Sequence, residues 1–586
     1  MTVRPYGWRG RRPMSSSQVR VRPLVIATAL LAGVGGEALA QAVERNPPPV
    51  NRPAAPLTPE IAPPAGPEEA DVAGPPLRGL AAASGADLAI LPEGRSAVVA
   101  GGDLRLTEAE LGQVLARHAG RPLTTAVVTA IQGDINAIYR RRGYPFAAVV
   151  TPPQDLSSGV LRLRIVEFRI GEVRQEPEDP DDDVRGSVRL SRGDAIPLRQ
   201  LQEDLVWLNR YPYRTVEAIF RPGAGLGETD LILRTSRTRP LAIFAGYGNT
   251  GSETTSWNRL FAGVQAGGLG LKDSLLAYQV TISPEDIGGR SERGYLSQSL
   301  QASAPVAPRA QVDLAANWIQ SHQRVEVFEL EDTMAEAAVS YRFALSNLTG
   351  SPQAPGDVWL GLEARRQVSV AAFGEVRVSS SAFNAYHLVA GYNRTRFAQV
   401  SQTEVEAVLR LSPGNLGDAN STYRIRSISD GRVEDAHYAY AGLSLVHARV
   451  LKGGRTLRAL VRAQATTGAL PRSEQFGLGG LTAARGYSYD DGAADHGLLV
   501  QGDLDFAEIP VVSDVISVQP SLIADAAWGR NASGGEDAAL ANIGVAATAR
   551  LAGRAELRAT VAGALADGAR TRAGDVRAVA RLTVRF

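Results

Sequence analysis

The residues that most often carry enzymatic chemistry are scattered through this sequence. The six histidines, at positions 118, 322, 387, 437, 447 and 496, include no HExxH motif and no pair at zinc-ligand spacing, and there is no cysteine. The glycine-rich stretch at 267–270 lacks the Gly-Lys-Ser/Thr ending of a phosphate-binding loop, so we interpret it as a strand and turn. No nucleophile elbow is present. The sequence therefore predicts no metal, no cofactor and no enzymatic activity.

Charge and hydropathy point to an exported protein. The formal net charge is +1, which provides no global field that would attract nucleic acid. The one long apolar run, Leu24 to Val34, is about half the length of a spanning helix, which needs roughly 20 residues. Arginines precede this run and Ala-Leu-Ala follows it. We therefore predict a signal peptide over residues 1–40, cut between Ala40 and Gln41.

The segment that follows, residues 41–94, is rich in proline and is predicted to be a linker. One alternative is that residues 77–91 form a short helix that plugs a pore. The start codon also stays open between Met1 and Met14.

Two tandem α/β units follow the linker, at 95–168 and 169–239. In the first, Thr107 and Glu110 form a capping box ahead of an apolar stripe, and a second helix runs from about Thr125 to Gly143. Strands are expected near 147–151 and 160–168. In the second unit, a short helix near 184–190 and a longer one from Pro197 precede two further strands. Each unit therefore has the predicted order β-α-α-β-β.

From residue 240 to residue 586 the apolar residues recur with a period of two. The clearest case is the last strand, where Val576, Ala578, Ala580, Leu582 and Val584 alternate with polar residues such as Arg577 and Arg581. A polar face that carries charges over many strands indicates a wet lumen rather than a packed core. Lipid offers no hydrogen bonds, so such strands can span a membrane only as a closed barrel. The period allows 14, 16 or 18 strands.

Short motifs in the α/β units carry a family resemblance. The first unit contains YRRRGY (139–144), PQ (153–154) and GVL (159–161), and the second contains LNRYP (208–212), PG (222–223) and GETDL (227–231). In this order and spacing, the motifs resemble the two POTRA domains of two-partner secretion transporters, in the Omp85 superfamily. The resemblance implies two periplasmic POTRA domains followed by a transmembrane antiparallel β-barrel of 16 strands in the bacterial outer membrane.

The segment GLGGLTAARGY (477–487) is similar to the signature of the long sixth extracellular loop of that superfamily. The resemblance implies that this loop folds back into the barrel, with a motif made of Gly479, Gly480, Arg485, Gly486 and Tyr487. Its arginine would contact a lumen aspartate on a late strand, a role that falls on Asp525, with Asp503 and Asp505 as the alternatives. A guanidinium fork matches a carboxylate geometrically, so such a contact is directional in a water-filled pore. The C-terminal aromatic residue, Phe586, would serve recognition during barrel assembly.

The resemblance implies an outer-membrane translocator. Its POTRA domains would bind an unfolded exoprotein by β-augmentation, and the barrel would export it without nucleotide hydrolysis. The expected partners are a large exoprotein (an adhesin, haemolysin or contact-dependent toxin), outer-membrane lipid and the barrel-assembly machinery, with no nucleic acid. An assembly factor that inserts other barrels and a passive porin are the alternatives.

Overall fold

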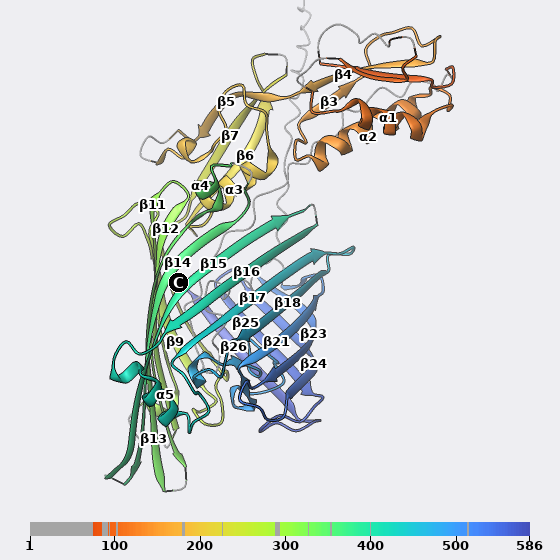
Figure 1. Ribbon diagram of the computed structural model, residues 1–586. Helices are drawn as coiled ribbons and strands as arrows, with labels where there is room; N and C mark the ends of the chain where they lie inside the picture. The colour runs from red at the N-terminus through yellow and green to blue at the C-terminus, as the bar shows by residue number, and fades with distance from the viewer. Residues whose placement is uncertain are drawn as a thin grey trace, which may run out of the picture. The chain divides into compact units, whose positions relative to one another are not determined.

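A computed structural model describes residues 74–84, 92, 94–100, 104–178, 182–211, 213–225, 227–287, 293–325, 327–351, 354–374, 376–398, 400–512 and 515–586 (Figure 1). The predicted signal peptide with its Ala40–Gln41 cleavage site, the two start codons and most of the predicted linker lie outside these residues. The described chain divides into two compact units. One comprises residues 74–202 and 217–235, and the other comprises residues 203–216 and 236–586.

The first α/β domain is a four-stranded sheet with two helices. The sheet has the order β2-β1-β4-β3, in which β1 lies parallel to both β2 and β4 and β3 is antiparallel to β4. The elements are β1 (Gly79–Ala83), β2 (Ala97–Ala100), α1 (Glu108–His118), α2 (Thr125–Arg141), β3 (Ala147–Val150) and β4 (Val160–Glu167). The predicted helices and the two later strands are therefore confirmed. Two strands, β1 and β2, precede the helices where the predicted order has one, so β1 is a further strand.

That further strand corrects two predictions. Residues 79–83 were expected in a linker or in a plug helix over 77–91, but they form β1 in the middle of the sheet. The sequence Gly-Leu-Ala-Ala-Ala has good helix formers, yet all five residues are buried between two neighbouring strands. Pairing on both edges thus outweighs the local helix propensity. Residues 85–91 of the same prediction lie outside the described residues.

The two helices cover the sheet through a single apolar core. The predicted capping box starts α1, since the Glu110 N–H donates to the Thr107 hydroxyl (3.3 Å) and the Thr107 N–H donates to the Glu110 carboxylate (3.0 Å). Gly143 follows α2 with a φ of +85°, a conformation that favours glycine at a helix end. Apolar residues of both helices and of β1 and β4 pack together with almost no exposure, among them Leu80, Leu111, Val114, Ile131, Ile135, Leu161, Leu163 and Ile165.

The second α/β domain has a three-stranded sheet of order β5-β7-β6, in which β5 and β7 run parallel. Its elements are β5 (Arg169–Glu176), a 3₁₀ turn at Arg185–Ser187, α3 (Leu198–Leu208), β6 (Arg214–Pro222) and β7 (Glu228–Arg237). The helix predicted near 184–190 is wrong, since only a single 3₁₀ turn forms there; Gly186 and the β-branched Val184 and Val188 disfavour a longer helix. The register of β5 shifts between Ile170 and Val173.

The rest of the chain closes into an antiparallel barrel. Its strands are β8 (Leu241–Gly248), β9 (Arg259–Gly267), β10 (Leu275–Ile282), β11 (Arg293–Ala307), β12 (Ala310–Val325), β13 (Phe328–Ala344), β14 (Asp357–Phe373), β15 (Val376–Phe397), β16 (Ser401–Pro413), β17 (His437–Val450), β18 (Thr456–Thr466), β21 (His496–Asp505), β22 (Ile509–Val512), β23 (Ile516–Arg530), β24 (Ala538–Leu551), β25 (Ala555–Ala564) and β26 (Val576–Arg585). Both β21 and β22 pair with β23, so they form one arm, and the described barrel has 16 strand positions. Pairing of β26 with β8 closes it.

The two faces of the barrel differ as the period of two predicts. On β14, Leu360 and Leu362 point outward and are 62% and 57% exposed. The neighbouring Glu363 points inward, where its carboxylate accepts a hydrogen bond of 2.7 Å from the Arg410 guanidinium. An apolar exterior around a charged interior is the arrangement that a lipid-embedded barrel with a wet lumen requires.

Short helical segments occur in the connections of the barrel, at α4 (Leu345–Thr349) and α5 (Thr422–Ile428), with 3₁₀ turns at Pro284–Asp286, Asp418–Asn420, Arg472–Glu474 and Tyr489–Asp491. Among the described residues, no helix has the length and apolar character needed to cross a membrane.

Candidate functional site

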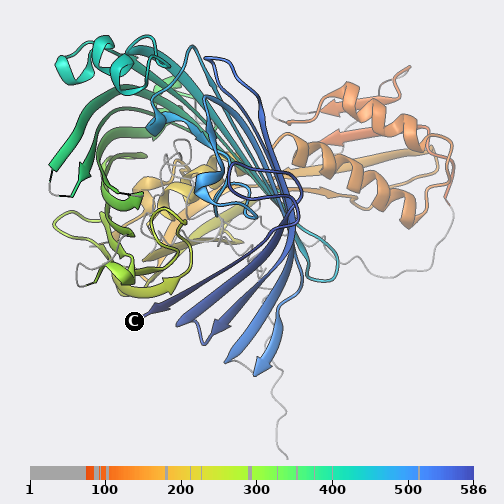
Figure 2. The same ribbon diagram turned by 90° about the horizontal axis from the view of Figure 1, so that it is seen from below.

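The connection between β18 and β21, residues 467–495, is the candidate site. Within it, β19 (Phe476–Gly477) pairs with β20 (Ala493–Ala494), and the segment between these two strands lies within the ring of barrel strands (Figure 2). Leu478, Ala483, Ala484 and Tyr487 are at most 1% exposed. A connection of this length would be exposed on a soluble surface, so its burial shows that it is held by contacts with the barrel wall. We call residues 467–495 the lumen loop.

The arginine of the lumen loop is bound by two carboxylates. The Arg485 Nε lies 2.9 Å from Asp525 Oδ2, and its Nη2 lies 2.6 Å from Asp525 Oδ1 on β23. The same Nη2 lies 2.6 Å from Oδ1 of Asp503 on β21. The backbone N–H of Arg485 also donates to Asp525 (3.0 Å). Arg485 is only 5% exposed, so this is a buried, forked ion pair rather than a solvated surface contact.

The structure separates the three candidate aspartates. Asp525 and Asp503 both bind Arg485, whereas Asp505 pairs with Arg458 on β18 and accepts a hydrogen bond from Ser521 (2.6 Å). Asp503 and Asp505 both face the lumen, because every second residue of β21 points inward. They lie two residues apart along the strand and therefore meet different arginines.

The other motif residues lie around Arg485. The Gly486 N–H donates to Asn542 Oδ1 on β24 (3.0 Å), and a Cβ on Gly486 would stand 2.7 Å from the Asn542 Cβ, so only glycine fits there. The Tyr487 hydroxyl lies 2.9 Å from Ala541 O and 2.8 Å from Ala566 O. Gly479 and Gly480 lie where the loop turns back, and the Gly480 N–H donates to Tyr487 O (3.1 Å).

A second set of contacts holds the loop to another part of the wall, and sequence reasoning missed it. Glu474, which is fully buried, pairs with Arg365 on β14 and accepts a hydrogen bond of 2.7 Å from the Tyr440 hydroxyl on β17. The Arg365 Nε also lies 2.6 Å from Glu336 on β13. A carboxylate in a polar loop segment is ordinarily solvent-exposed, so nothing in the local sequence marks Glu474.

Two aspartates tie down the end of the loop. Asp491 accepts hydrogen bonds from the backbone N–H groups of Arg570 (2.8 Å) and Thr571 (2.7 Å), in the connection between β25 and β26. Asp495 binds the guanidinium of Arg432 (3.1 Å) and the Leu470 N–H (3.0 Å). The lumen loop is therefore attached to strands and connections around much of the barrel.

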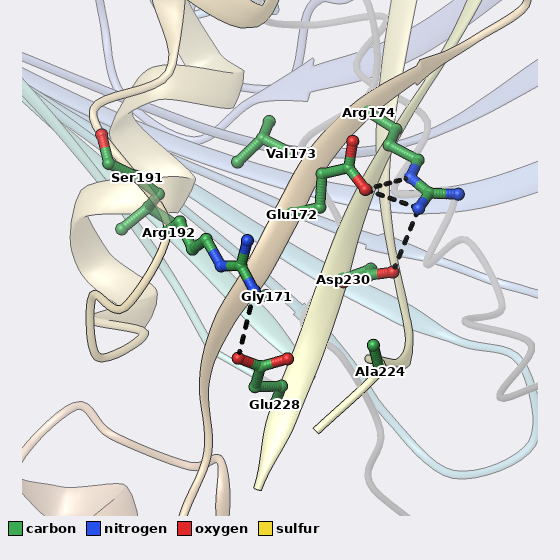
Figure 3. Close-up of a pocket in the computed structure, with 10 residues that line it drawn as sticks. Gly171, Glu172, Val173, Arg174, Ser191, Arg192, Ala224, Glu228 and Asp230 are labelled. Carbon is green, nitrogen blue, oxygen red and sulfur yellow. Dashed lines mark hydrogen bonds and ion pairs between the residues drawn. The ribbon is translucent and has the colours of Figure 1, made fainter. Parts of the chain in front are cut away.

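A groove in the second α/β domain is a separate candidate site (Figure 3). It has a volume of about 520 Å³ and lies beside β5, where the register shift leaves Gly171 and Glu172 out of regular pairing with β7. Its charges are paired, Arg174 with Glu172 (2.7 Å) and Arg192 with Glu228 (3.7 Å). The hydrogen bonds to Glu172 raise the pKa of the Arg174 guanidinium. A strand edge beside a groove of mixed charge can accept an extended peptide.

The C-terminal Phe586 follows β26 at the closing seam. Its N–H donates to Ile243 O on β8 (2.9 Å), and its side chain is 79% exposed. An exposed terminal aromatic side chain is available to another protein, and its predicted role in barrel assembly stays a prediction.

Two family models match parts of the chain. A family model described as POTRA domain, ShlB-type, matches residues 96–167. Another, described as haemolysin secretion/activation protein ShlB/FhaC/HecB, matches residues 227–551, which is more than half of the chain.

Individual relatives are more distant. Outer membrane transporter CdiB-2 of Burkholderia pseudomallei (strain 1026b) is 30% identical over 141 residues, 24% of either protein. Outer membrane transporter CdiB of Escherichia coli is 28% identical over 166 residues, 28% of either protein, so the matched part spans about a quarter of these relatives. Heme/hemopexin transporter protein HuxB of Haemophilus influenzae (strain 86-028NP) is 19% identical over 444 residues, 72% of this chain and 73% of that protein.

Solved structures share the fold. The structure of CdiB from Escherichia coli gives a TM-score of 0.63 at 19% identity and covers 91% of this chain and 94% of that one. CdiB from Acinetobacter baumannii gives 0.54 at 15% identity, with 88% and 91% covered. The predicted fold, a 16-stranded barrel preceded by α/β domains, is confirmed. The chain belongs to the haemolysin secretion/activation protein ShlB/FhaC/HecB family, and its barrel is an outer-membrane barrel preceded by a ShlB-type POTRA domain.

Proposed function

We propose that this protein exports one large exoprotein across the outer membrane through its barrel. The observation that carries the proposal is the buried lumen loop, held inside a charged interior by Arg485 and Glu474. A passive porin needs an open water-filled lumen, whereas a loop with ion pairs to different parts of the wall is a removable barrier. Such a barrier suits a transporter that admits a polypeptide only when a partner is engaged.

Capture of the exoprotein takes place at strand edges of the periplasmic α/β domains. In the second domain, which we assign as the second POTRA domain, β5 is an edge strand of its sheet and the groove of Figure 3 runs beside it. An unfolded exoprotein in extended form can pair with such an edge through its backbone, which tolerates many side chains. The paired charges of Arg192 and Glu228 add selectivity for the segment that binds.

Transport requires no nucleotide in this proposal. Folding of the exoprotein outside the cell would make its passage irreversible, because the folded state does not re-enter the lumen. The expected exported class is an adhesin, haemolysin or contact-dependent toxin, and the description of the matching family as haemolysin secretion/activation proteins supports a haemolysin among these. Outer-membrane lipid surrounds the barrel, and the barrel-assembly machinery would insert it, with Phe586 as part of the recognised end.

A secretion assay tests the proposal. The full chain and a variant lacking residues 77–239 are each expressed with the exoprotein encoded beside it, and exoprotein in the medium is measured. Export by the full chain alone supports a dedicated transporter. Export that is equal in cells with and without the protein would refute it, and failure of other barrels to assemble in its absence would point to an insertase.

A further inference from the structure

Besides the Asp495–Arg432 pair, which binds a connection, the lumen loop has ion pairs of opposite polarity at two places on the barrel strands. At the first, the loop contributes a cation, Arg485, and the wall contributes Asp525 and Asp503. At the second, the loop contributes an anion, Glu474, and the wall contributes Arg365. We call these the arginine anchor and the glutamate anchor. The two anchors differ in the charges that remain on the barrel wall after the loop has moved away.

Release of the arginine anchor would leave an unfavourable wall. The Oδ1 atoms of Asp503 and Asp525 both lie 2.6 Å from one Arg485 nitrogen, so they are within about 5 Å of each other. Without Arg485, Asp525 keeps a hydrogen bond from Asn542 (2.9 Å), and Asp503 keeps Arg558 at 3.5 Å. Two neighbouring carboxylates would then share one distant cation, and like charges at this separation repel.

Release of the glutamate anchor leaves no such problem. Arg365 remains bound to Glu336 at 2.6 Å, so the wall stays neutral when Glu474 departs. The next pair along the same wall, Glu363 with Arg410, is already complete at 2.7 Å. Glu474 itself can be hydrated once it leaves, since it is a single carboxylate on a 3₁₀ turn next to Ser473. Breaking the glutamate anchor therefore costs less free energy than breaking the arginine anchor.

We propose that Glu474 and Arg365 form the release point of the lumen loop, and that the exoprotein passes between the loop and the wall made by β13, β14 and β17. Arg485 stays bound to Asp525 and acts as the pivot. The release point rests on the proposed export function. In addition, it specifies which contact of the loop moves and which side of the lumen opens. After release, the Glu336–Arg365 and Glu363–Arg410 pairs and the Tyr440 hydroxyl remain there, so among the described residues the release point itself holds no unpaired charge that would trap an unfolded chain.

The first test is ion conductance of the purified full-length protein in planar bilayers, which requires no exoprotein. Glu474→Gln retains the size of the side chain but removes its charge. Openings are expected to become about tenfold more frequent or more, the effect of losing a hydrogen bond between charged groups. The matched control is Glu508→Gln, which breaks an exposed pair with Arg550 outside the loop. Openings of Glu474→Gln at the frequency of the unaltered protein would overturn the proposal.

The second test fixes the pivot. The chain has no cysteine, so Ala483→Cys with Gln501→Cys introduces a single thiol pair beside the arginine anchor, where the Gln501 side chain donates to Ala483 O (2.7 Å). A bis-methanethiosulfonate reagent joins the two thiols through disulfide bonds that reduction breaks. Openings caused by Glu474→Gln are expected to persist when this cross-link has formed and to be unchanged by reduction. Loss of those openings in the cross-linked form, with recovery on reduction, would show that the arginine anchor is the one that moves.

A variant that fails to fold is recognised by loss of the heat-dependent gel shift of a closed barrel. In that case Arg365→Lys keeps the charge but loses the fork that reaches both Glu474 and Glu336. It is expected to raise the opening frequency in the same direction, and a frequency equal to that of the unaltered protein would again contradict the release point. Because conductance is measured without cargo, failure of the export function would leave these outcomes unaffected.

Discussion

Arg485 and Asp525 are joined by a two-pronged ion pair and by a backbone hydrogen bond, across 40 positions of the sequence. The loop residue thereby fixes its side chain and its main chain to the same carboxylate. Asn542 donates to that carboxylate as well (2.9 Å) and accepts the N–H of Gly486, so the contact continues onto a second strand. This relationship sets the position of the loop within the lumen.

Arg485→Ala is expected to reduce exoprotein export at least about tenfold while the barrel still assembles, because breaking a buried pair costs ~3–5 kcal/mol and leaves Asp503 and Asp525 with only Arg558 as a neighbouring cation. Arg485→Lys is expected to be intermediate, since an ammonium cannot bridge both carboxylates as a fork does. The control is Arg530→Ala, an exposed arginine at the end of β23. Exoprotein in the medium and the heat-dependent gel shift are measured, and normal export by Arg485→Ala would contradict the role of the anchor.

Gly486→Ala is expected to displace the loop, because the new Cβ would stand 2.7 Å from the Asn542 Cβ. The matched control is Gly468→Ala in the same loop, where nothing lies within 4 Å of the added atom. Overpacking of this kind costs ~1–3 kcal/mol. Protease accessibility of the loop in intact cells is the measurement. Equal accessibility in the two variants would show that close packing at Gly486 does not hold the loop.

Ser191→Trp is expected to lower export by filling the groove beside β5 with an indole ring, without unfolding the domain. Ser158→Trp, an exposed position in the first α/β domain away from the groove, is the control. Export and helical circular dichroism are measured for both. Unchanged export by Ser191→Trp with normal assembly would remove the groove from the capture step.

The first α/β domain is expected to lose stability in acid through Glu110. Burial raises the pKa of this carboxyl, but the Thr107 N–H and hydroxyl and the Arg142 guanidinium outweigh burial and hold the pKa below its ordinary value of 4.5. A lowered folded-state pKa contributes stability above the unfolded value, and that contribution is lost as the pH falls through the folded value. Helical circular dichroism followed from neutral pH to below 4.5 is the measurement. Glu110→Gln should be less acid-sensitive, and identical acid profiles would contradict this.

Sequence reasoning captured what depends on local pattern. The capping box at Thr107 and Glu110, the extent of α2 and the period of two on β26 follow from neighbouring residues, and each appears as expected. The strand Gly79–Ala83 was missed because its burial comes from partners 17 and 81 residues away, Ala97 paired with Leu80 and Val160 paired with Gly79. Small apolar residues alone cannot distinguish a buried strand from a helix.

The candidate site likewise contains residues that could be predicted from the sequence and one that could not. Family resemblance pointed to Arg485 and Asp525, whereas Glu474 had no such guide. Its partners Arg365 and Tyr440 lie 109 and 34 positions away, and they meet it only because β14 and β17 share one lumen. A carboxylate in a loop becomes a wall contact when the loop folds inward, and that depends on barrel closure rather than on local sequence.

The most direct measurement is cross-linking of a stalled exoprotein to single cysteines on the two faces of β13, possible because the chain has no cysteine of its own. Ser340 shares the inner face with Glu336, whereas Val339 points outward and is 41% exposed. The exoprotein is stalled by a folded block at its C-terminus and carries a thiol-reactive group along its length. It is expected to cross-link to Ser340→Cys and not to Val339→Cys. Equal labelling of both, or none at Ser340→Cys while export proceeds, would contradict transport through the lumen.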